Sequence, residues 1–149
     1  MGVKPETIQN ELSIFRNTGM RQKIYEKNGM TIIEDCYNAG PESTEAALGV
    51  LASVKTSGKR IAVLGDMLEL GERSEEFHRE TGRAALDAGA LLLTTGELSA
   101  VMGGEHYGSK AALIADLPKR LRRGDVVLVK ASHSMAFEEI SEALREIKL

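Results

Sequence analysis

The chain has 149 residues and a net charge of -3, with 42% hydrophobic and 28% charged residues. This size and composition predict one globular domain and exclude a disordered tail, a fibrous repeat and a disulfide scaffold. The mild acidity, the 4% aromatic content and the lack of tryptophan argue against a nucleic-acid binder. The chain has one cysteine, no apolar leader and no run near the roughly 20 apolar residues of a membrane helix, so a cytoplasmic location is expected.

The first predicted elements are a short helix over residues 5–16 and a hairpin of strands 23–26 and 31–34 around Asn28 and Gly29. Beyond the hairpin, β-branched runs alternate with segments of helical period, which is typical of an α/β domain with a mostly parallel sheet. Further strands are expected at 61–64, 91–95 and 126–129, and helices at 43–55 with Ser43 as N-cap, 74–88, 110–123 and 134–147. The predicted fold is a Rossmann-like three-layer domain with one antiparallel edge strand at its N-terminal end.

Polar residues follow four predicted strands at their carboxyl ends, where open parallel sheets bind ligands beside helix N-termini. They are Asp35 and Asn38, Asp66 and Glu69, Thr94 and Thr95, and Lys130 and Ser132. In a parallel sheet these groups converge on one edge, although a cap or turn role explains any single Asp, Asn, Ser or Thr equally well. Lys130 differs, because a lysine directly after a buried Val-Val-Leu-Val strand must bring its ammonium to water, a carboxylate or a ligand.

Neither common nucleotide fingerprint is present. Gly58 and Lys59 are followed by arginine and lack the upstream glycine of a phosphate loop, and no G-x-G-x-x-G follows a strand. The chain is therefore not expected to hold a triphosphate by itself. His78 lies on a polar helical stretch without a metal partner or nucleophile nearby in sequence, so a packing or surface position is favoured over a ligand role by roughly two to one.

Several stretches in chain order resemble a known family. They are residues 18–21, residues 33–43 with Asp-x-Tyr-Asn-Ala-x-Pro-x-Ser, residues 63–71 with Gly-Asp-Met-x-Glu-Leu-Gly, His78, and residues 128–132 with Leu-Val-Lys-Ala-Ser. They closely resemble the C-terminal domain of the Mur ligases, in the branch that joins D-alanyl-D-alanine to the UDP-N-acetylmuramoyl tripeptide of the bacterial cell wall. The resemblance runs from about Pro5 to the C-terminus.

This resemblance implies an ATP-dependent ligase of three domains, of which the chain, residues 1–149, is the third. The N-terminal UDP-sugar domain and the central domain, which carries the phosphate loop and most magnesium ligands, are expected to be absent. The implied cofactors are ATP and Mg²⁺, the implied substrates are the tripeptide and D-alanyl-D-alanine, and the implied partners are the other two domains. The tripeptide carboxylate would become an acyl phosphate that the dipeptide amine attacks. The chain alone is expected to be inactive.

The family motifs also imply a nucleotide side of the site. Arg21 would donate charge-assisted hydrogen bonds to the ATP phosphates, and Asp35 would accept hydrogen bonds from the ribose hydroxyls. Tyr37 and Asn38 would line the adenine or ribose side of the cleft. Asp66, Glu69 and His78 are kept as family-motif residues without an assigned ligand, and no catalytic or metal-ligating residue is expected in this chain.

A dipeptide side follows from the last stretch. Lys130 and Ser132 would face D-alanyl-D-alanine, because an ammonium suits its carboxylate and a hydroxyl can donate or accept.

Two positions depart from the family pattern. His133 stands where the family usually has arginine, so a fixed charge is replaced by one that depends on pH. Gly40 replaces the usual Asn or Ser, which is expected to loosen that turn.

A different class of protein shares part of this pattern, namely the receiver modules that accept a phosphoryl group in signalling. The shared positions are Glu34 with Asp35, Asp66, Thr95 and Lys130. Only one helix and one strand fit between Asp35 and Asp66, whereas a receiver needs two crossovers, each of about a dozen or more residues, before its phosphoacceptor. The ligase domain is therefore favoured, the receiver is the alternative, and a plain interaction domain is the weakest option.

Overall fold

The computed structural model describes residues 22–35 and 39–149, in which six strands form one sheet. The strands are β1 (Lys23–Lys27), β2 (Met30–Asp35), β3 (Arg60–Leu64), β4 (Ala90–Thr95), β5 (Glu105–Tyr107) and β6 (Val126–Lys130). Their order across the sheet is β1-β2-β6-β3-β4-β5. The β1–β2 pair is antiparallel and the other neighbouring pairs are parallel. The predicted sheet with its antiparallel edge is confirmed, whereas the helix expected over residues 5–16 lies outside the described residues.

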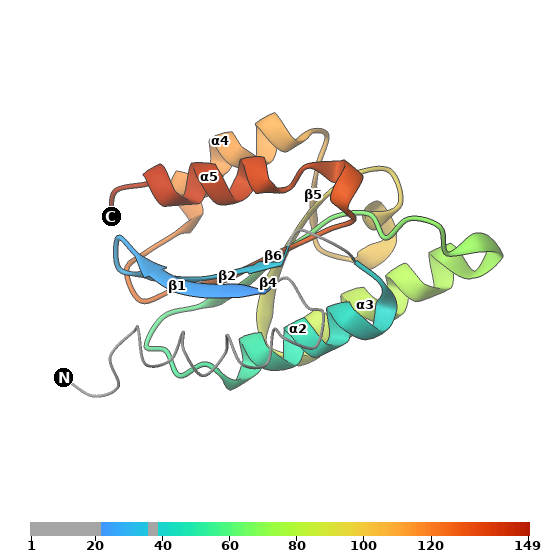
Figure 1. Ribbon diagram of the computed structural model, residues 1–149, viewed down its shortest axis with the longest axis horizontal. Coiled ribbons are helices and arrows are strands. Elements are labelled where there is room, and N and C mark those ends of the chain that lie inside the picture. Colours follow the sequence, from blue (N-terminus) through green and yellow to red (C-terminus); the bar gives the residue numbers. More distant parts are fainter. Residues whose placement is uncertain (1–21, 36–38) are drawn as a thin grey trace.

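In the described part of the chain, α-helices cover both faces of the sheet (Figure 1). They are α2 (Pro41–Ser53) and α3 (Ser74–Asp87) on one face, and α4 (Lys110–Arg120) and α5 (Glu138–Glu146) on the other. Successive strand side chains point to opposite faces. Ile33 and Leu128 therefore pack with α2 and α3, whereas Ile32 and Val127 pack with α4 and α5. The predicted three-layer α/β fold is confirmed. None of the described helices is both long and apolar enough to cross a membrane.

The hairpin turn between β1 and β2 is fixed by Asn28 and Gly29. Both residues have positive φ, 53° and 86°, which suits the Asn-Gly pair of a tight hairpin. The Asn28 amide also donates hydrogen bonds to the carbonyl oxygens of Arg145 and Ile147, at 3.2 and 2.6 Å. The turn therefore lies against the C-terminal end of α5, as Figure 1 shows.

The start of α2 differs from the prediction. The helix begins at Pro41, with Gly40 as N-cap, so Ser43 is not the cap. Proline suits the first helical position because its φ is already helical and it has no amide to satisfy. The Ser43 hydroxyl instead accepts a hydrogen bond from the Gly40 amide at 3.1 Å from within the first turn.

The C-terminal region and the far edge of the sheet also differ from the prediction. The helix expected over residues 134–147 is divided into a short 3-10 turn, η3 (His133–Met135), and α5. Ala136 between them has a φ of 54°, in the left-handed region, which ends the first piece. Strand β5 was not predicted, because its three residues are polar or aromatic and lack an apolar alternation. Two further 3-10 turns, η1 (Gly71–Arg73) and η2 (Ser99–Met102), lie in the connections.

At the amino ends of the parallel strands, Asp125 ties β6 to β3. Its carboxylate accepts hydrogen bonds from the amides of Lys59 and Arg122, at 2.8 and 2.9 Å. The Lys59 ammonium lies 2.9 Å from the same carboxylate. The Asp125 side chain is 1% exposed and that of Lys59 is 46% exposed, so the carboxylate is the buried member of the pair.

Candidate functional site

The carboxyl ends of β2, β6, β3 and β4 lie along one edge of the sheet, because these strands run parallel. We call the residues that follow these ends the carboxyl rim. Asp35 and Lys130 are the last residues of β2 and β6, and Asp66 follows β3 by two residues. The structure divides the predicted site residues into two bonded groups on this rim and a third group that turns toward β5.

The first group is an ion pair between neighbouring strands. Asp35 and Lys130 are register partners in β2 and β6, and the Lys130 Nζ atom lies 3.0 Å from the Asp35 Oδ2 atom. The Lys130 side chain is 1% exposed and that of Asp35 is 5% exposed. Of the three environments predicted for the Lys130 ammonium, the structure therefore shows a carboxylate. Both residues are in phase with Ile33 and Leu128, so their side chains lie on the sheet face covered by α2 and α3.

The second group is centred on the buried carboxylate of Asp66. Its Oδ1 atom accepts hydrogen bonds from the amides of Leu98 and Ser99, at 3.0 and 2.9 Å, and its Oδ2 atom accepts one from the amide of Glu97 at 3.0 Å. Gly96 completes this loop with a φ of 125°, and a Cβ atom there would collide with the Asp66 carboxylate. Asp66 therefore holds the loop that leaves β4, which is a structural role.

Ser132 connects the loop after β6 to the loop after β3. Its amide donates to the Asp66 carbonyl at 3.2 Å, and its hydroxyl oxygen accepts a hydrogen bond from the Leu68 amide at 3.0 Å. A hydroxyl that accepts one bond keeps its own hydrogen for a second partner. Ser132 is 8% exposed. The next residue, His133, has a side chain that is 69% exposed and lies 3.8 Å from Glu138.

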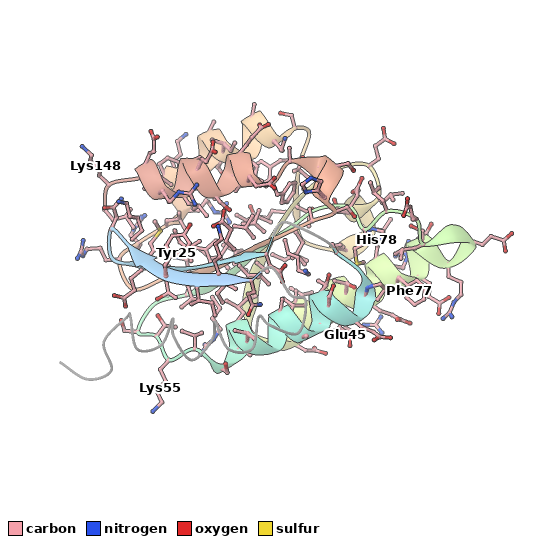
Figure 2. The ribbon with its side chains drawn as sticks, viewed as in Figure 1. Tyr25, Glu45, Lys55, Phe77, His78 and Lys148 are labelled. Carbon is pink, nitrogen blue, oxygen red and sulfur yellow. The ribbon has the colours of Figure 1, made fainter. Side chains whose placement is uncertain are left out.

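His78 holds the loop after β3 from the side of α3, where Figure 2 labels it. Its Nε2 atom accepts a hydrogen bond from the Met67 amide at 2.9 Å. Its Nδ1 atom lies 2.7 Å from the Ser74 carbonyl oxygen, so the ring proton is assigned to Nδ1. The imidazole is fully buried, so of the packing and surface positions that the sequence left open, the structure shows the packing one. Glu69 is exposed and has a left-handed φ of 64°.

Thr94 and Thr95 lie at the end of β4 but turn toward β5. The Thr94 hydroxyl shares a 2.8 Å hydrogen bond with the Nδ1 atom of His106, and the Thr95 hydroxyl donates to the Tyr107 carbonyl at 3.0 Å. Both threonines are buried. They fix the short edge strand and are not joined to the Asp35–Lys130 pair by any described hydrogen bond.

Three predicted nucleotide contacts, Arg21, Tyr37 and Asn38, lie outside the described residues. Their roles stay predictions. In the two described ranges, no group of three or more His, Cys, Asp or Glu side chains is placed to hold a metal ion.

Two leucines at the rim were not singled out from the sequence. Leu68 and Leu98 are each 37% exposed, and their amides are the ones bound by Ser132 and Asp66. Leu98 stands between Glu97 and Ser99, but Leu68 follows Met67, so the two positions share no sequence pattern, and exposure cannot be inferred from one apolar position. Single exposed apolar side chains are ordinary on protein surfaces, so no binding role is assigned to these leucines.

The rim geometry can be compared with known proteins. A family model described as "Mur ligase, glutamate ligase domain" matches residues 20–133. The chain belongs to this Mur ligase family. The match spans the ends of β2, β3, β4 and β6, and therefore includes both bonded groups of the rim.

Curated relatives identify the branch of the Mur ligase family that the chain resembles. The UDP-N-acetylmuramoyl-tripeptide--D-alanyl-D-alanine ligase of Bacillus subtilis is 37% identical over 161 residues, which cover 99% of this chain and 35% of that protein. The ligase of the same name from Escherichia coli is 41% identical over 123 residues, 77% of this chain and 27% of that protein. The chain thus spans about a third or less of the length of these relatives.

Solved Mur ligase structures share the fold. The crystal structure of MurF ligase from Thermotoga maritima in complex with ADP matches with a TM-score of 0.73 at 31% identity, covering 91% of this chain and 36% of that one. A MurF structure from Acinetobacter baumannii matches with a TM-score of 0.75 at 24% identity and supports the fold.

The receiver alternative is not supported. In that interpretation Asp66 would offer its carboxylate to a phosphoryl group, but both of its oxygens accept backbone hydrogen bonds. Lys130 pairs with Asp35 and Thr95 donates to Tyr107, so neither is committed to Asp66. The matched relatives and structures are Mur ligases.

Proposed function

We propose that the chain is the C-terminal domain of an ATP-dependent ligase that joins D-alanyl-D-alanine to UDP-N-acetylmuramoyl tripeptide in peptidoglycan synthesis. The observation that carries this proposal is the alignment with the Bacillus subtilis ligase of that name, which is 37% identical and covers 99% of this chain. The family description names a glutamate ligase domain and does not mention the dipeptide. The relatives' names favour the dipeptide.

The proposed reaction has two steps. A tripeptide carboxylate oxygen forms a bond to the γ-phosphorus of ATP while the bond between that phosphorus and the β,γ-bridging oxygen breaks, which releases ADP and leaves an acyl phosphate. The dipeptide amine then attacks the acyl carbon, the carbon–oxygen bond to phosphate breaks, and the amine loses a proton. Both steps depend on positioning, on stabilisation of negative charge and on exclusion of water, and closure of one domain over another provides these conditions.

On the nucleotide side, the proposal assigns the ATP phosphates to Arg21 and the ribose hydroxyls to Asp35, with Tyr37 and Asn38 lining the same side of the cleft. The position of Asp35 at the end of β2 supports its assignment to the nucleotide, because parallel sheets bind ligands at the carboxyl ends of their strands. The ADP complex of the Thermotoga relative, 31% identical, supports a nucleotide as ligand.

On the dipeptide side, the proposal assigns Lys130 and Ser132. Lys130 ends β6 and Ser132 follows two residues later, and the hydroxyl hydrogen of Ser132 is suited to a second partner because its oxygen already accepts from the Leu68 amide. The end of β6 lies beside the end of β2, so a nucleotide and a dipeptide would meet across neighbouring strands.

Magnesium is proposed to be held mainly by the central domain. Two features of the described rim support this proposal: the Asp35 carboxylate pairs with Lys130, and the Asp66 carboxylate accepts three amide hydrogen bonds. Mg²⁺ prefers carboxylate oxygens together with phosphate oxygens and water. No step of the proposed reaction is therefore assigned to a metal bound by this chain.

The remaining parts of the proposed enzyme are an N-terminal domain for the UDP-sugar and a central domain for ATP. The relatives are roughly three to four times as long as the stretch that this chain matches, which leaves room for both. We infer that the reaction takes place in the cytoplasm, because ATP is its co-substrate. We also infer that the chain alone does not catalyse it.

The test is ADP release by the full-length protein that contains this chain. We expect release to require both the tripeptide and D-alanyl-D-alanine, and L-alanyl-L-alanine to be a poor substitute. The isolated 149-residue chain serves as the inactive control. Release that proceeds equally well with glutamate, or without any dipeptide, would overturn the proposed substrate.

A further inference from the structure

The Asp35–Lys130 pair is the most deeply buried charged contact on the rim. The two charged atoms are 3.0 Å apart and the side chains are 5% and 1% exposed. Burying both charges carries a large desolvation cost, and well-packed apolar residues often serve stability as well or better. Stability alone therefore does not explain this pair. The best-attested role for buried ion pairs is to fix one arrangement of the elements that they join, which here are two strands.

The location of the pair indicates what it fixes. Asp35 ends β2, and α2 begins at Pro41, six residues later. Lys130 ends β6 and is followed two residues later by Ser132, which binds the loop after β3. One bond thus joins the chain segment that leads into α2 to the chain segment that carries Ser132.

We propose that Lys130 is a positioning residue that acts through Asp35 and couples the nucleotide and dipeptide sides of the rim. This inference rests on the proposed function and deepens it. With 1% of its side chain exposed, Lys130 influences the dipeptide by fixing the end of β6 and not by an ion pair with the dipeptide carboxylate. Asp35 is held in place for the nucleotide by the same bond. Loss of the bond therefore weakens the use of both substrates.

A matched control lies at the other end of the same sheet. Lys59 and Asp125 form an ion pair of 2.9 Å that joins the amino ends of β3 and β6, and the Asp125 side chain is 1% exposed. Lys59→Met removes an ammonium from a buried aspartate, as Lys130→Met does, but far from the rim. This control variant distinguishes the general effect of losing an ion pair from the loss of coupling between the two sides of the rim.

The first experiment measures KM for ATP and KM for D-alanyl-D-alanine in the full-length protein. We expect Lys130→Met to raise both KM values together, by about tenfold each, which is a typical size for coupling between sites. Asp35→Asn is expected to do the same, and the double variant to be no worse than either single variant. Lys59→Met should leave both KM values unchanged. Lys130→Arg, which keeps the charge, should restore part of the loss.

Two outcomes would overturn the inference. In one, Lys130→Met raises only the dipeptide KM, Asp35→Asn raises only the ATP KM, and the effects add in the double variant, which means separate direct contacts. In the other, neither KM changes. If Lys130→Met does not fold, the double variant Lys130→Met/Asp35→Leu, which leaves no unpaired buried charge, takes its place with the same expected rise in both KM values.

A second readout on the 149-residue chain distinguishes failure of this inference from failure of the proposed function. Amide exchange at Ala39 and Thr44, around the start of α2, is expected to accelerate in Lys130→Met and not in Lys59→Met. If the full-length protein has no dipeptide-dependent activity but this exchange pattern is found, the proposed function fails and the positioning role of Lys130 stands. Unchanged exchange at both residues would remove that role.

Discussion

The His78 imidazole accepts a hydrogen bond from the backbone amide of Met67 at 2.9 Å while its other ring nitrogen binds the Ser74 carbonyl. One side chain thus satisfies an amide of the loop after β3 and a carbonyl at the start of α3. Because Met67 and the His78 ring are both buried, the Met67 amide has no water to replace the ring nitrogen when the ring is removed.

We therefore expect His78→Ala to lower the free energy of unfolding by about 1–3 kcal/mol, the cost of leaving a buried donor without a partner. Urea unfolding of the 149-residue chain measures it. His133→Ala is the control, because the His133 side chain is 69% exposed and the change should stay within about 0.5 kcal/mol. Equal stability of the two variants would contradict a structural role for His78.

Asp66→Asn is expected to open the loop after β4. An amide side chain has one accepting oxygen, so at least one of the Glu97, Leu98 and Ser99 amides loses its acceptor. The expected loss is again about 1–3 kcal/mol, with faster amide exchange confined to this loop. Asp87→Asn, at an exposed position near the end of α3, should cost nothing measurable. Unchanged exchange at Leu98 and Ser99 in Asp66→Asn would argue against this structural role.

The two members of the Lys59–Asp125 pair should contribute unequally to stability. Lys59→Met removes only an ammonium whose side chain is 46% exposed, so a loss of about 0.2–1 kcal/mol is expected. Asp125→Ala also leaves the Lys59 and Arg122 amides without an acceptor and should cost about 1–3 kcal/mol. Denaturant titrations of both variants measure the two losses of unfolding free energy. A larger loss in Lys59→Met than in Asp125→Ala would contradict this prediction.

Because of Tyr107, the free energy of unfolding should decrease as the pH rises above about 10. Burial and a 2.5 Å hydrogen bond donated to Asp116 raise the pKa of Tyr107 to about 12, against about 10 for a free tyrosine. The unfolded chain therefore releases this proton first, so the contribution of Tyr107 to stability is full below pH 10 and is lost as the pH rises toward about 12. We expect the stability of the wild-type chain to fall more steeply over that range than that of Tyr107→Phe. Identical slopes would show that the Tyr107 pKa is not raised.

Arg21→Ala is predicted to raise the KM for ATP in the full-length protein. A charge-assisted hydrogen bond to phosphate contributes roughly 1.5–3 kcal/mol, which corresponds to about ten- to a hundredfold in KM. The KM for D-alanyl-D-alanine should change much less. Arg83→Ala, on an exposed part of α3, is the control, and an unaltered KM for ATP in Arg21→Ala would remove Arg21 from the nucleotide side.

Local patterns were sufficient to predict most of the fold. The Asn-Gly turn, the apolar strands and the helical periods over 43–55 and 74–88 place most of the elements within a few residues. Strand β5 was missed for lack of an apolar alternation, and two other errors occur where one residue overrides a longer pattern. Pro41 begins α2 earlier than Ser43 predicts, and the left-handed Ala136 interrupts the last helical pattern.

The site was harder to predict than the fold, because a side chain at a strand end has several possible partners. The sequence places Asp35, Asp66 and Lys130 on the rim but does not show that Lys130 turns to Asp35 and that Asp66 turns to the loop after β4. Those choices depend on strand order, and β6 lies next to β2 although 90 residues lie between Asp35, the last residue of β2, and Val126, the first residue of β6. Pairing at such a distance leaves no periodic signal in one sequence.

The place of β6 in the sheet also matters while the protein is being made. A nascent chain that has emerged from the ribosome only as far as α4 holds two separate groups of strands, β1–β2 and β3–β4–β5, each with an open edge. Open edges invite pairing with other chains, so chaperones are expected to meet the growing polypeptide at this stage. Translation of β6 then joins the two groups into one sheet.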